Sequence, residues 1–169
     1  VRNMFRDCNV MAGNSSFENW DTSNIELAGG MFRGARIFNQ DITSWDTSSF
    51  TKTDTMFYGA RTFNQPIGSW DMSNVTTIQA MFRDNYVFDQ SLANWNINNI
   101  TIMIIFLPHS SLSASNYDAT LISWAAQTPQ LNQSPNFGGS QYTLGGAAEV
   151  ARNTLINTYG WTITDGGGI

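Results

Sequence analysis

The chain has 169 residues, of which 41% are apolar and 13% aromatic, and this is enough for one domain with its own core. Its net charge is −5 and its basic residues form no run, which argues against a nucleic-acid-binding surface. The longest apolar run, Ile102 to Leu107, is far shorter than the roughly 18 residues of a membrane-spanning helix, so we expect no membrane insertion. Cys8 is the only cysteine, which excludes an intramolecular disulfide and a cysteine zinc site.

Tryptophan recurs every 25 residues along the first part of the chain, and other apolar residues recur in register with it. The main columns are Trp20, Trp45, Trp70 and Trp95; Met31, Met56 and Met81; Phe32, Phe57 and Phe82; and Phe38, Phe63 and Phe88. A fixed period in this range is typical of a repeat array, in which each unit buries its apolar face by stacking on the next. The residues predicted to be buried in the second full repeat are Met56, Phe57, Phe63, Ile67 and Trp70.

Each repeat combines two patterns. Apolar residues spaced i, i+3, i+6, i+7 predict a short helix, as at Val75, Ile78, Met81 and Phe82. The glycines that follow this face, Gly34 and Gly59, and Asp84 and Asn85 in the third repeat, suit a left-handed helix end. The other half of the repeat suits a short strand that pairs with the same segment of the next repeat, about 4.8 Å away. A two-residue insertion is expected near Val10 to Ser16.

The repeat pattern ends near Ser111, which divides the chain into repeats at 1–111 and a capping segment at 112–169. In the capping segment the pattern predicts helices at 113–127 and 145–159 and short strands at 141–144 and 161–164. A repeat stack needs its last exposed core covered, and this segment is the natural cover. Because Val1 to Phe5 matches the end of a repeat, we expect a monomeric domain of a longer protein.

The motif Met-Phe-x-x-Ala-x-x-Phe-Asn-Gln-x-Ile-x-x-Trp-Asp-x-Ser occurs at Met31 to Ser48 and again at Met56 to Ser73. It resembles the 25-residue repeat of BspA-like leucine-rich repeat surface proteins, a domain of unknown function that also occurs in mycoplasma lipoproteins. The resemblance implies a cell-surface location and an adhesion or host-interaction role, and it supplies no catalytic residues. The fold class we expect is therefore α/β: a leucine-rich-repeat-like solenoid with short parallel strands and a C-terminal α/β cap.

Three columns allow both a structural and a functional interpretation. The acids after tryptophan, Asp21, Asp46 and Asp71, would cap turns or bind a row of calcium ions, although one acid per repeat is few for calcium. The polar side chains that follow phenylalanine, nearly all of them amides, would form a hydrogen-bonded ladder or a polar ligand-binding stripe. They are Asn39, Asn64 and Asp89, with Gln40, Gln65 and Gln90. The tryptophans would form the core or, at the surface, a platform for sugars or peptides.

Arginine and tyrosine form two further columns, which are Arg6, Arg33, Tyr58 and Arg83, and Arg36 with Arg61. Five of the eight basic residues lie here. At the ends of the predicted helices they would interact favourably with the helix dipole. Alternatively, Arg33, Arg36, Tyr58, Arg61 and Arg83 bind an acidic partner, since Arg and Tyr are enriched at binding hot spots.

We expect a non-catalytic binding module of a bacterial cell-surface or secreted protein, with a protein, peptide or glycan ligand on the exposed face of the repeats. The alternative is a structural spacer within a larger surface protein. No phosphate-binding loop, nucleophile elbow or metal-binding helix motif occurs in the sequence, so we expect no cofactor, no metal and no enzyme activity. His109, the single histidine, is interpreted as a linker residue at the junction with the cap.

Overall fold

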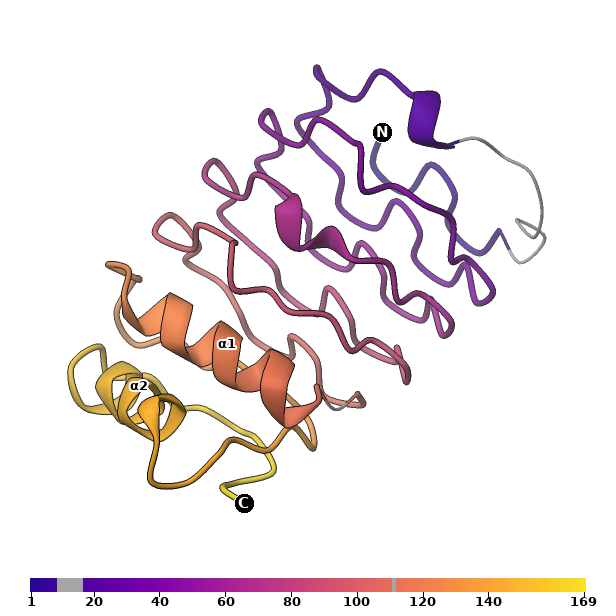
Figure 1. Cartoon of the computed structure of the whole chain (residues 1–169). Helices are drawn as coiled ribbons and strands as arrows, with labels where there is room; N and C mark the ends of the chain where they lie inside the picture. The colour runs from indigo at the N-terminus through magenta and orange to yellow at the C-terminus, as the bar shows by residue number, and fades with distance from the viewer. Residues whose placement is uncertain (9–16, 111) are drawn as a thin grey trace.

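The computed structural model describes residues 1–8, 17–110 and 112–169. Its first two thirds are a stack of irregular coils, and two helices close the C-terminal end of the stack (Figure 1). The helices are α1, Ala114–Ala125, and α2, Ala147–Asn157. Two single turns of 3₁₀ helix lie in the coils, η1 at Phe17–Asn19 and η2 at Ile67–Ser69. The insertion expected near Val10 to Ser16 lies outside the described residues.

The coils are not built as the sequence predicted. Within the described residues they contain no α-helix and no strand; neighbouring coils meet in isolated parallel bridges that run from Leu27 to Lys52, Thr77 and Ile102. The expected fold class, an α/β leucine-rich-repeat-like solenoid with short parallel strands, is therefore wrong.

A regular alternation of hydrogen bonds replaces both predicted elements. The amides of Thr55, Phe57 and Gly59 donate to carbonyls of the next coil at 2.8–2.9 Å. The intervening amides of Met56 and Tyr58 donate to the carbonyl three residues back, both at 3.1 Å. Each coil is thus a chain of tight turns, and alternate amides in this segment bond to its neighbour.

Left-handed residues keep these turns from becoming a helix. Thr55 and Ala80 have φ values of 56° and 51°, where a right-handed helix cannot continue. Four residues later the backbone is left-handed again, at Gly59 (φ 70°) and Asp84 (φ 58°). The left-handed geometry predicted at Gly34, Gly59 and Asp84 is confirmed, although it ends a turn rather than a helix, whereas Asn85 is not left-handed.

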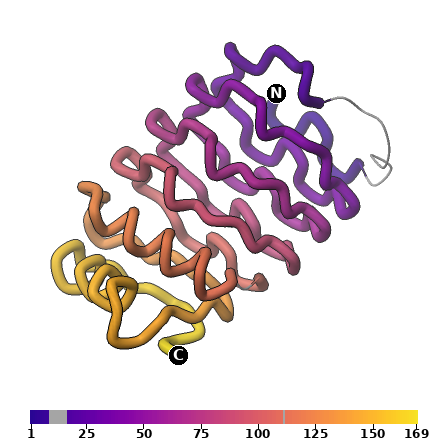
Figure 2. The backbone as a smooth tube through the Cα atoms, in the orientation of Figure 1, coloured from indigo at the N-terminus to yellow at the C-terminus, as the bar shows by residue number. Residues whose placement is uncertain are grey.

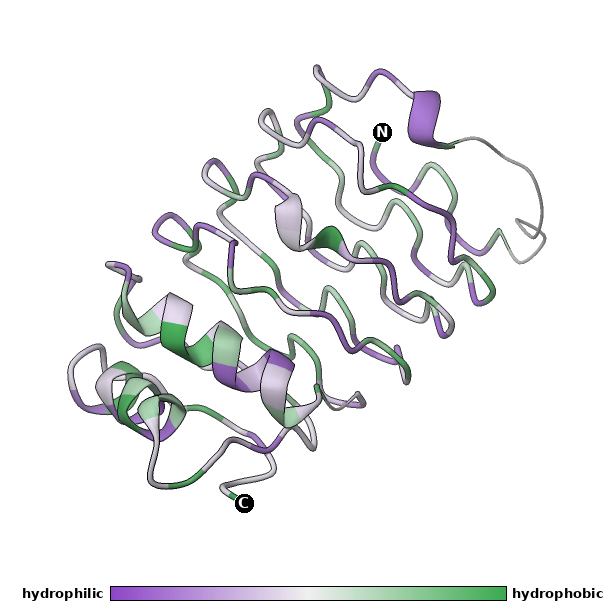
Figure 3. Ribbon diagram, viewed as in Figure 1, coloured by the Kyte–Doolittle hydropathy of each residue, from purple (hydrophilic) through white to green (hydrophobic). Residues whose placement is uncertain are grey.

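Stacked aromatic rings fill the interior of the coils. The rings of Phe32, Phe57 and Phe82 lie 5.7 Å apart from one coil to the next and are nearly parallel. Phe63, stacked 3.9 Å from Phe57, has no exposed surface. The predicted burial of Met56, Phe57, Phe63, Ile67 and Trp70 is confirmed. Hydrophilic and hydrophobic stretches are interspersed along each coil (Figure 3).

The tryptophan column belongs mostly to this core. Trp45, Trp70 and Trp95 are at most 4% exposed, whereas Trp20 in the first coil is 38% exposed. Each buried indole N–H donates to a carbonyl of the preceding coil, at 2.8 Å from Trp45, 3.2 Å from Trp70 and 2.9 Å from Trp95. The column therefore joins the coils through their side chains as well as filling the core, which confirms the core interpretation for these three residues.

Helix α1 occupies the position that a further coil would take (Figures 1 and 2). The indole N–H of Trp124 donates to Leu92 O at 3.0 Å, repeating the bond that Trp95 makes to Ile67 O. The hydroxyl of Thr120 accepts from the Leu92 amide at 3.1 Å. Both predicted helices of this segment are confirmed with shorter bounds, but its predicted strands are reduced to isolated bridges, such as Tyr142 with Gly168.

We predict that Phe63→Ala lowers the free energy of unfolding by about 3–5 kcal/mol, because it leaves a buried cavity between the rings of Phe38 and Phe88. Urea denaturation followed by tryptophan fluorescence would measure the change. The control is Val87→Ala, at a side chain that is 46% exposed, for which a change within about 0.5 kcal/mol is expected. A loss for Phe63→Ala as small as the control's would show that the ring is not a core contact.

We also predict that Trp124→Phe lowers the free energy of unfolding by about 1–3 kcal/mol, because the Leu92 carbonyl loses its indole donor in a buried place. The control on the same helix is Ile122→Ala, at an exposed side chain. Equal stability of the Trp124 variant and the wild type would mean that α1 covers the last coil without replacing its hydrogen bonds.

Candidate functional site

The predicted arginine and tyrosine columns come together on the turns at one side of the stack. The Arg33 guanidinium carbon lies 4.6 Å from the centre of the Tyr58 ring, and that of Arg83 lies 5.5 Å from the same ring. In the neighbouring column the Arg61 guanidinium carbon lies 5.7 Å from the centre of the Tyr86 ring. These distances are within the range of cation–π contacts. We call this surface the Arg–Tyr stripe, comprising Arg33, Arg36, Tyr58, Arg61, Arg83 and Tyr86.

Tyr86 was missed by the sequence reasoning, although the signal was present. It lies 25 residues after Arg61, so the period alone places it in the same column. Its ring is 54% exposed. It also stacks on His109, with 6.1 Å between ring centres, and His109 Nδ1 lies 2.6 Å from Asp84 Oδ1. The sequence favours His109 as a linker residue, but these contacts place it at the border of the stripe.

The helix-dipole explanation of the arginines does not hold. The stripe lies on tight turns, and in the described part of the chain the α-helices are confined to the capping segment. Arg33, Arg61 and Arg83 contact tyrosine rings of neighbouring coils instead. Their clustering therefore needs another explanation.

Three stripe arginines lack an acidic partner. No carboxylate of the described residues lies within 4.0 Å of the guanidinium nitrogens of Arg33, Arg61 or Arg83. Elsewhere Arg2 pairs with Asp54 at 3.2 Å and Arg152 with Asp165 at 2.7 Å. Three fixed positive charges therefore face solvent in a chain whose net charge is −5.

A shallow hollow extends the stripe toward the N-terminus. Its volume of about 150 Å³ is below that of usual small-molecule sites. It is lined by Arg2, Asn3, Arg6, Gly29, Arg33, Asp54 and Thr55. Arg6 lies 3.5 Å from Asp7 and is exposed, so it borders the ring-stacked part of its column without joining it.

The acids after tryptophan cap turns. Asp21, Asp46 and Asp71 each accept a hydrogen bond from the amide two residues later, at 3.1, 3.0 and 2.8 Å. The hydroxyls of Ser23 and Ser48, followed by their amides, hold the pKa of Asp21 and of Asp46 below its usual value. The turn-capping interpretation is confirmed. Among the described residues no three His, Cys, Asp or Glu side chains are grouped to hold a metal ion.

The amide column is a structural ladder, as the first interpretation held. Asn39 Oδ1 accepts from the Asn64 amide at 2.9 Å and from Gln65 Nε2 at 3.1 Å. Asn64 Oδ1 does the same for Asp89 and Gln90 in the next coil. The ladder ends on Asp89, whose Oδ1 accepts from the Ser113 amide and hydroxyl and from Asn116 Nδ2 at 2.7–2.9 Å. It therefore ties the last coil to the start of α1.

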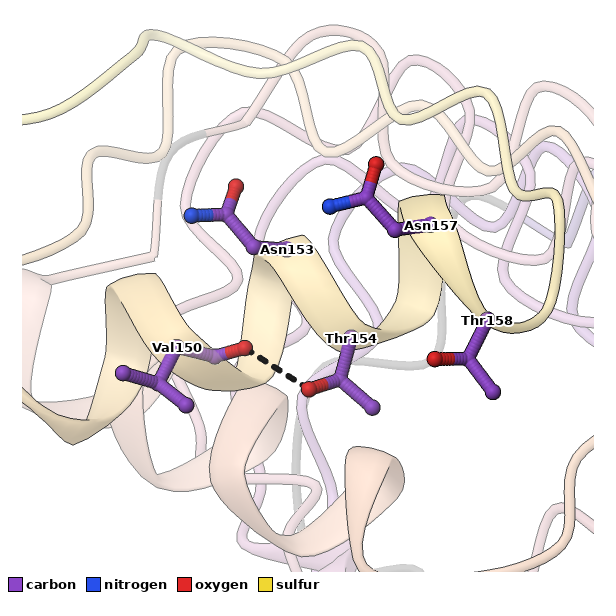
Figure 4. A pocket seen from close by; sticks show the side chains of 5 residues that line it. All are labelled: Val150, Asn153, Thr154, Asn157 and Thr158. Atoms are coloured by element: carbon purple, nitrogen blue, oxygen red, sulfur yellow. Dashed lines mark hydrogen bonds between the residues drawn. The ribbon is translucent and has the colours of Figure 1, made fainter.

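A second hollow lies on the outer side of α2, where Figure 4 shows its lining side chains spread along one face of the helix. Thr154 Oγ1 donates to Val150 O at 2.9 Å within this face. The residues are Val150, Asn153, Thr154, Asn157 and Thr158. They include no acid, base or nucleophile pair, so they offer no chemistry of their own.

The buried Tyr117–Asp165–Arg152 cluster is structural. Asp165 is bound by two Arg152 nitrogens, at 2.7 and 3.2 Å, and by the Tyr117 hydroxyl at 2.8 Å. Burial, followed by the Asp165 charge, raises the pKa of Tyr117 above its usual range. The cluster joins α1, α2 and the C-terminal segment, and its groups satisfy one another.

By its fold the chain is a repeat protein built from stacked 25-residue coils with a helical cover. A family model described as "Mycoplasma protein of unknown function, DUF285" matches residues 1–124, so the chain belongs to the DUF285 family. No curated protein and no solved structure matches it. Among the described residues no helix is long and apolar enough to span a membrane.

We predict that Asp89→Asn reduces stability at neutral pH and that its difference from the wild type narrows in acid. Burial raises the pKa of Asp89, but the hydrogen bonds from Asn116 and Ser113 outweigh burial and leave the pKa below its usual value. A carboxyl with a lowered folded-state pKa stabilises the fold above its unfolded pKa, and this contribution is lost as the pH falls through the folded pKa. Urea midpoints of both proteins between about pH 7 and pH 2 would measure it, since the unfolded pKa is about 3.9. A difference that does not change with pH would contradict the assignment.

Proposed function

We propose that the protein is a non-catalytic binding module of a bacterial cell-surface or secreted protein, and that it holds a protein, peptide or glycan ligand on the Arg–Tyr stripe. The observation that carries this proposal is the group of three guanidiniums placed against tyrosine rings without carboxylate partners. Orienting an arginine in advance lowers the entropy cost of binding through it. Arg and Tyr are also the side chains most often found at binding hot spots.

Three further observations support the location. The family description names a mycoplasma protein, which is compatible with a bacterial surface protein. The repeat motif resembles that of BspA-like surface proteins, and we propose this finer relationship for the chain. The surface of the coils is rich in Asn, Ser, Thr and Gln and low in charge, as in many exposed bacterial proteins.

A structural spacer is the second candidate. The continuous ladders of backbone bonds, indole bonds and amide bonds would make the stack stiff, and a stiff stack could hold another domain away from the cell. The two functions differ in what the stripe does. A spacer gains nothing from arginines that have no acidic partner.

We predict that the purified chain binds ligands on a combined glycan and peptide array, and that Arg33→Ala with Arg83→Ala weakens binding to the best ligand at least about tenfold, because these side chains flank the central ring of the stripe. Calorimetry would measure the affinity, and circular dichroism would check folding. The control is Lys52→Ala, which removes one positive charge outside the stripe and is compared with Arg83→Ala alone. Absence of any array ligand favours the spacer. Unchanged affinity of the double variant places the site on another face.

A further inference from the structure

We infer that the ligand of the Arg–Tyr stripe is an extended acidic peptide, with carboxylate side chains three residues apart, that lies along the stack axis. This inference rests on the proposed function and names its partner class. It depends on three properties of the stripe, which are the orientation of the guanidiniums, their lack of acidic partners and their spacing.

The orientation comes from the rings. Tyr58 lies in the coil between those of Arg33 and Arg83, and both guanidiniums contact its ring. A guanidinium stacked on a ring keeps its N–H groups at its edge, where they can bind a carboxylate with two parallel hydrogen bonds. Arg33, Tyr58 and Arg83 are all half-buried, so their motion is restricted before the ligand arrives.

The lack of acidic partners sets the charge of the ligand. The chain has 13 acidic residues and 8 basic ones, yet the described carboxylates leave Arg33, Arg61 and Arg83 without ion pairs. The nearby acids have other partners, since Asp54 binds Arg2 and Asp84 binds His109. The complementary ligand therefore carries negative charge.

The spacing sets the form of the ligand. Arg33 and Arg83 lie two coils apart, and the phenylalanine rings of the preceding column are 5.7 Å apart from one coil to the next. Their guanidinium carbons are therefore about 10 Å apart, which is also the largest separation that their distances of 4.6 and 5.5 Å from the Tyr58 ring centre allow. An extended peptide advances about 3.1–3.4 Å per residue, so side chains three residues apart are about 9–10 Å apart. In a polyproline II conformation, with three residues per turn, those side chains also lie on the same face. The intervening residues would then pass over the Tyr58 ring.

The test uses the whole chain and two fluorescent Gly/Ser peptides of equal composition, one with Glu at every third position and one with its Glu residues adjacent. Fluorescence anisotropy at low and at physiological salt would measure affinity. We expect the spaced peptide to bind at least about fivefold more tightly than the clustered peptide, because only the former matches the two guanidiniums. Equal affinities would overturn the spacing argument.

Further variants separate the stripe from general charge attraction. Arg33→Gln with Arg83→Gln should weaken binding of the spaced peptide at least about tenfold. Arg83→Gln alone should weaken it more than Lys52→Gln, which removes the same single charge outside the stripe and should change the affinity less than about twofold. Tyr58→Leu leaves the net charge unchanged and should weaken binding about threefold or more, because the guanidiniums lose the ring that orients them. Thermal melts would confirm that each variant is folded, and Tyr58→Phe should restore binding. Unchanged affinity in Tyr58→Leu, or equal losses in Arg83→Gln and Lys52→Gln, would overturn the inference.

An acidic polysaccharide, polygalacturonate, is the comparison ligand. If it binds at the stripe and the spaced peptide does not, the peptide inference is wrong while the proposed binding function stands. If array ligands bind through the stripe but neither anion does, the same conclusion holds. If the array yields no ligand and both anions fail, the proposed function fails as well.

Discussion

The rest of the structure depends on one pattern of backbone hydrogen bonds, in which successive amides of a coil donate alternately to the next coil and within their own coil. In the segment from Thr55 to Gly59, successive amides donate in turn to the next coil and to the carbonyl three residues back. Backbone polar groups are costly to bury without partners, and this alternation satisfies them without helix or sheet. It also holds neighbouring coils in one register, so that residues 25 positions apart become neighbours.

That register turns each column of the sequence into a physical row. The phenylalanine columns become stacks of rings with 5.7–6.3 Å between centres, and these supply the core. The tryptophan column adds an indole bond from coil to coil, and the amide column adds a ladder at the surface. The Arg–Tyr stripe results from the same geometry, because a tyrosine that follows an arginine after 25 residues lies directly beside it. Core and candidate site thus depend on one constraint.

Such a stack has an open end wherever a coil lacks a neighbour, and the capping segment shows how one end is closed. Helix α1 supplies the donors and acceptors that a coil would supply, from Asn116 at its start to Trp124 near its end. Gln127 extends this cover, since its side chain accepts from the Ile97 amide at 2.8 Å and donates to Trp95 O at 2.9 Å. A regular helix can replace an irregular coil here because the bonds from α1 itself to the last coil are made by side chains, such as those of Asn116, Thr120 and Trp124.

The sequence by itself determined the repeat length, the buried columns, the left-handed turn ends at Gly34, Gly59 and Asp84, and the two capping helices, because each depends on residue type at fixed spacing. The left-handed Thr55 and Ala80 carry no such signal. Phe63 is buried in any fold that stacks these repeats, and Gly59 suits a left-handed turn whatever precedes it. Only the tertiary structure decided that the coils contain neither helix nor strand. Apolar residues at Val75, Ile78, Met81 and Phe82 fit a helix and a chain of tight turns equally well. The two differ in whether alternate amides donate within the coil or to the next one, and a neighbouring coil must be present to accept them. For the same reason the contact of Arg61 with Tyr86 appears only once the stack has formed.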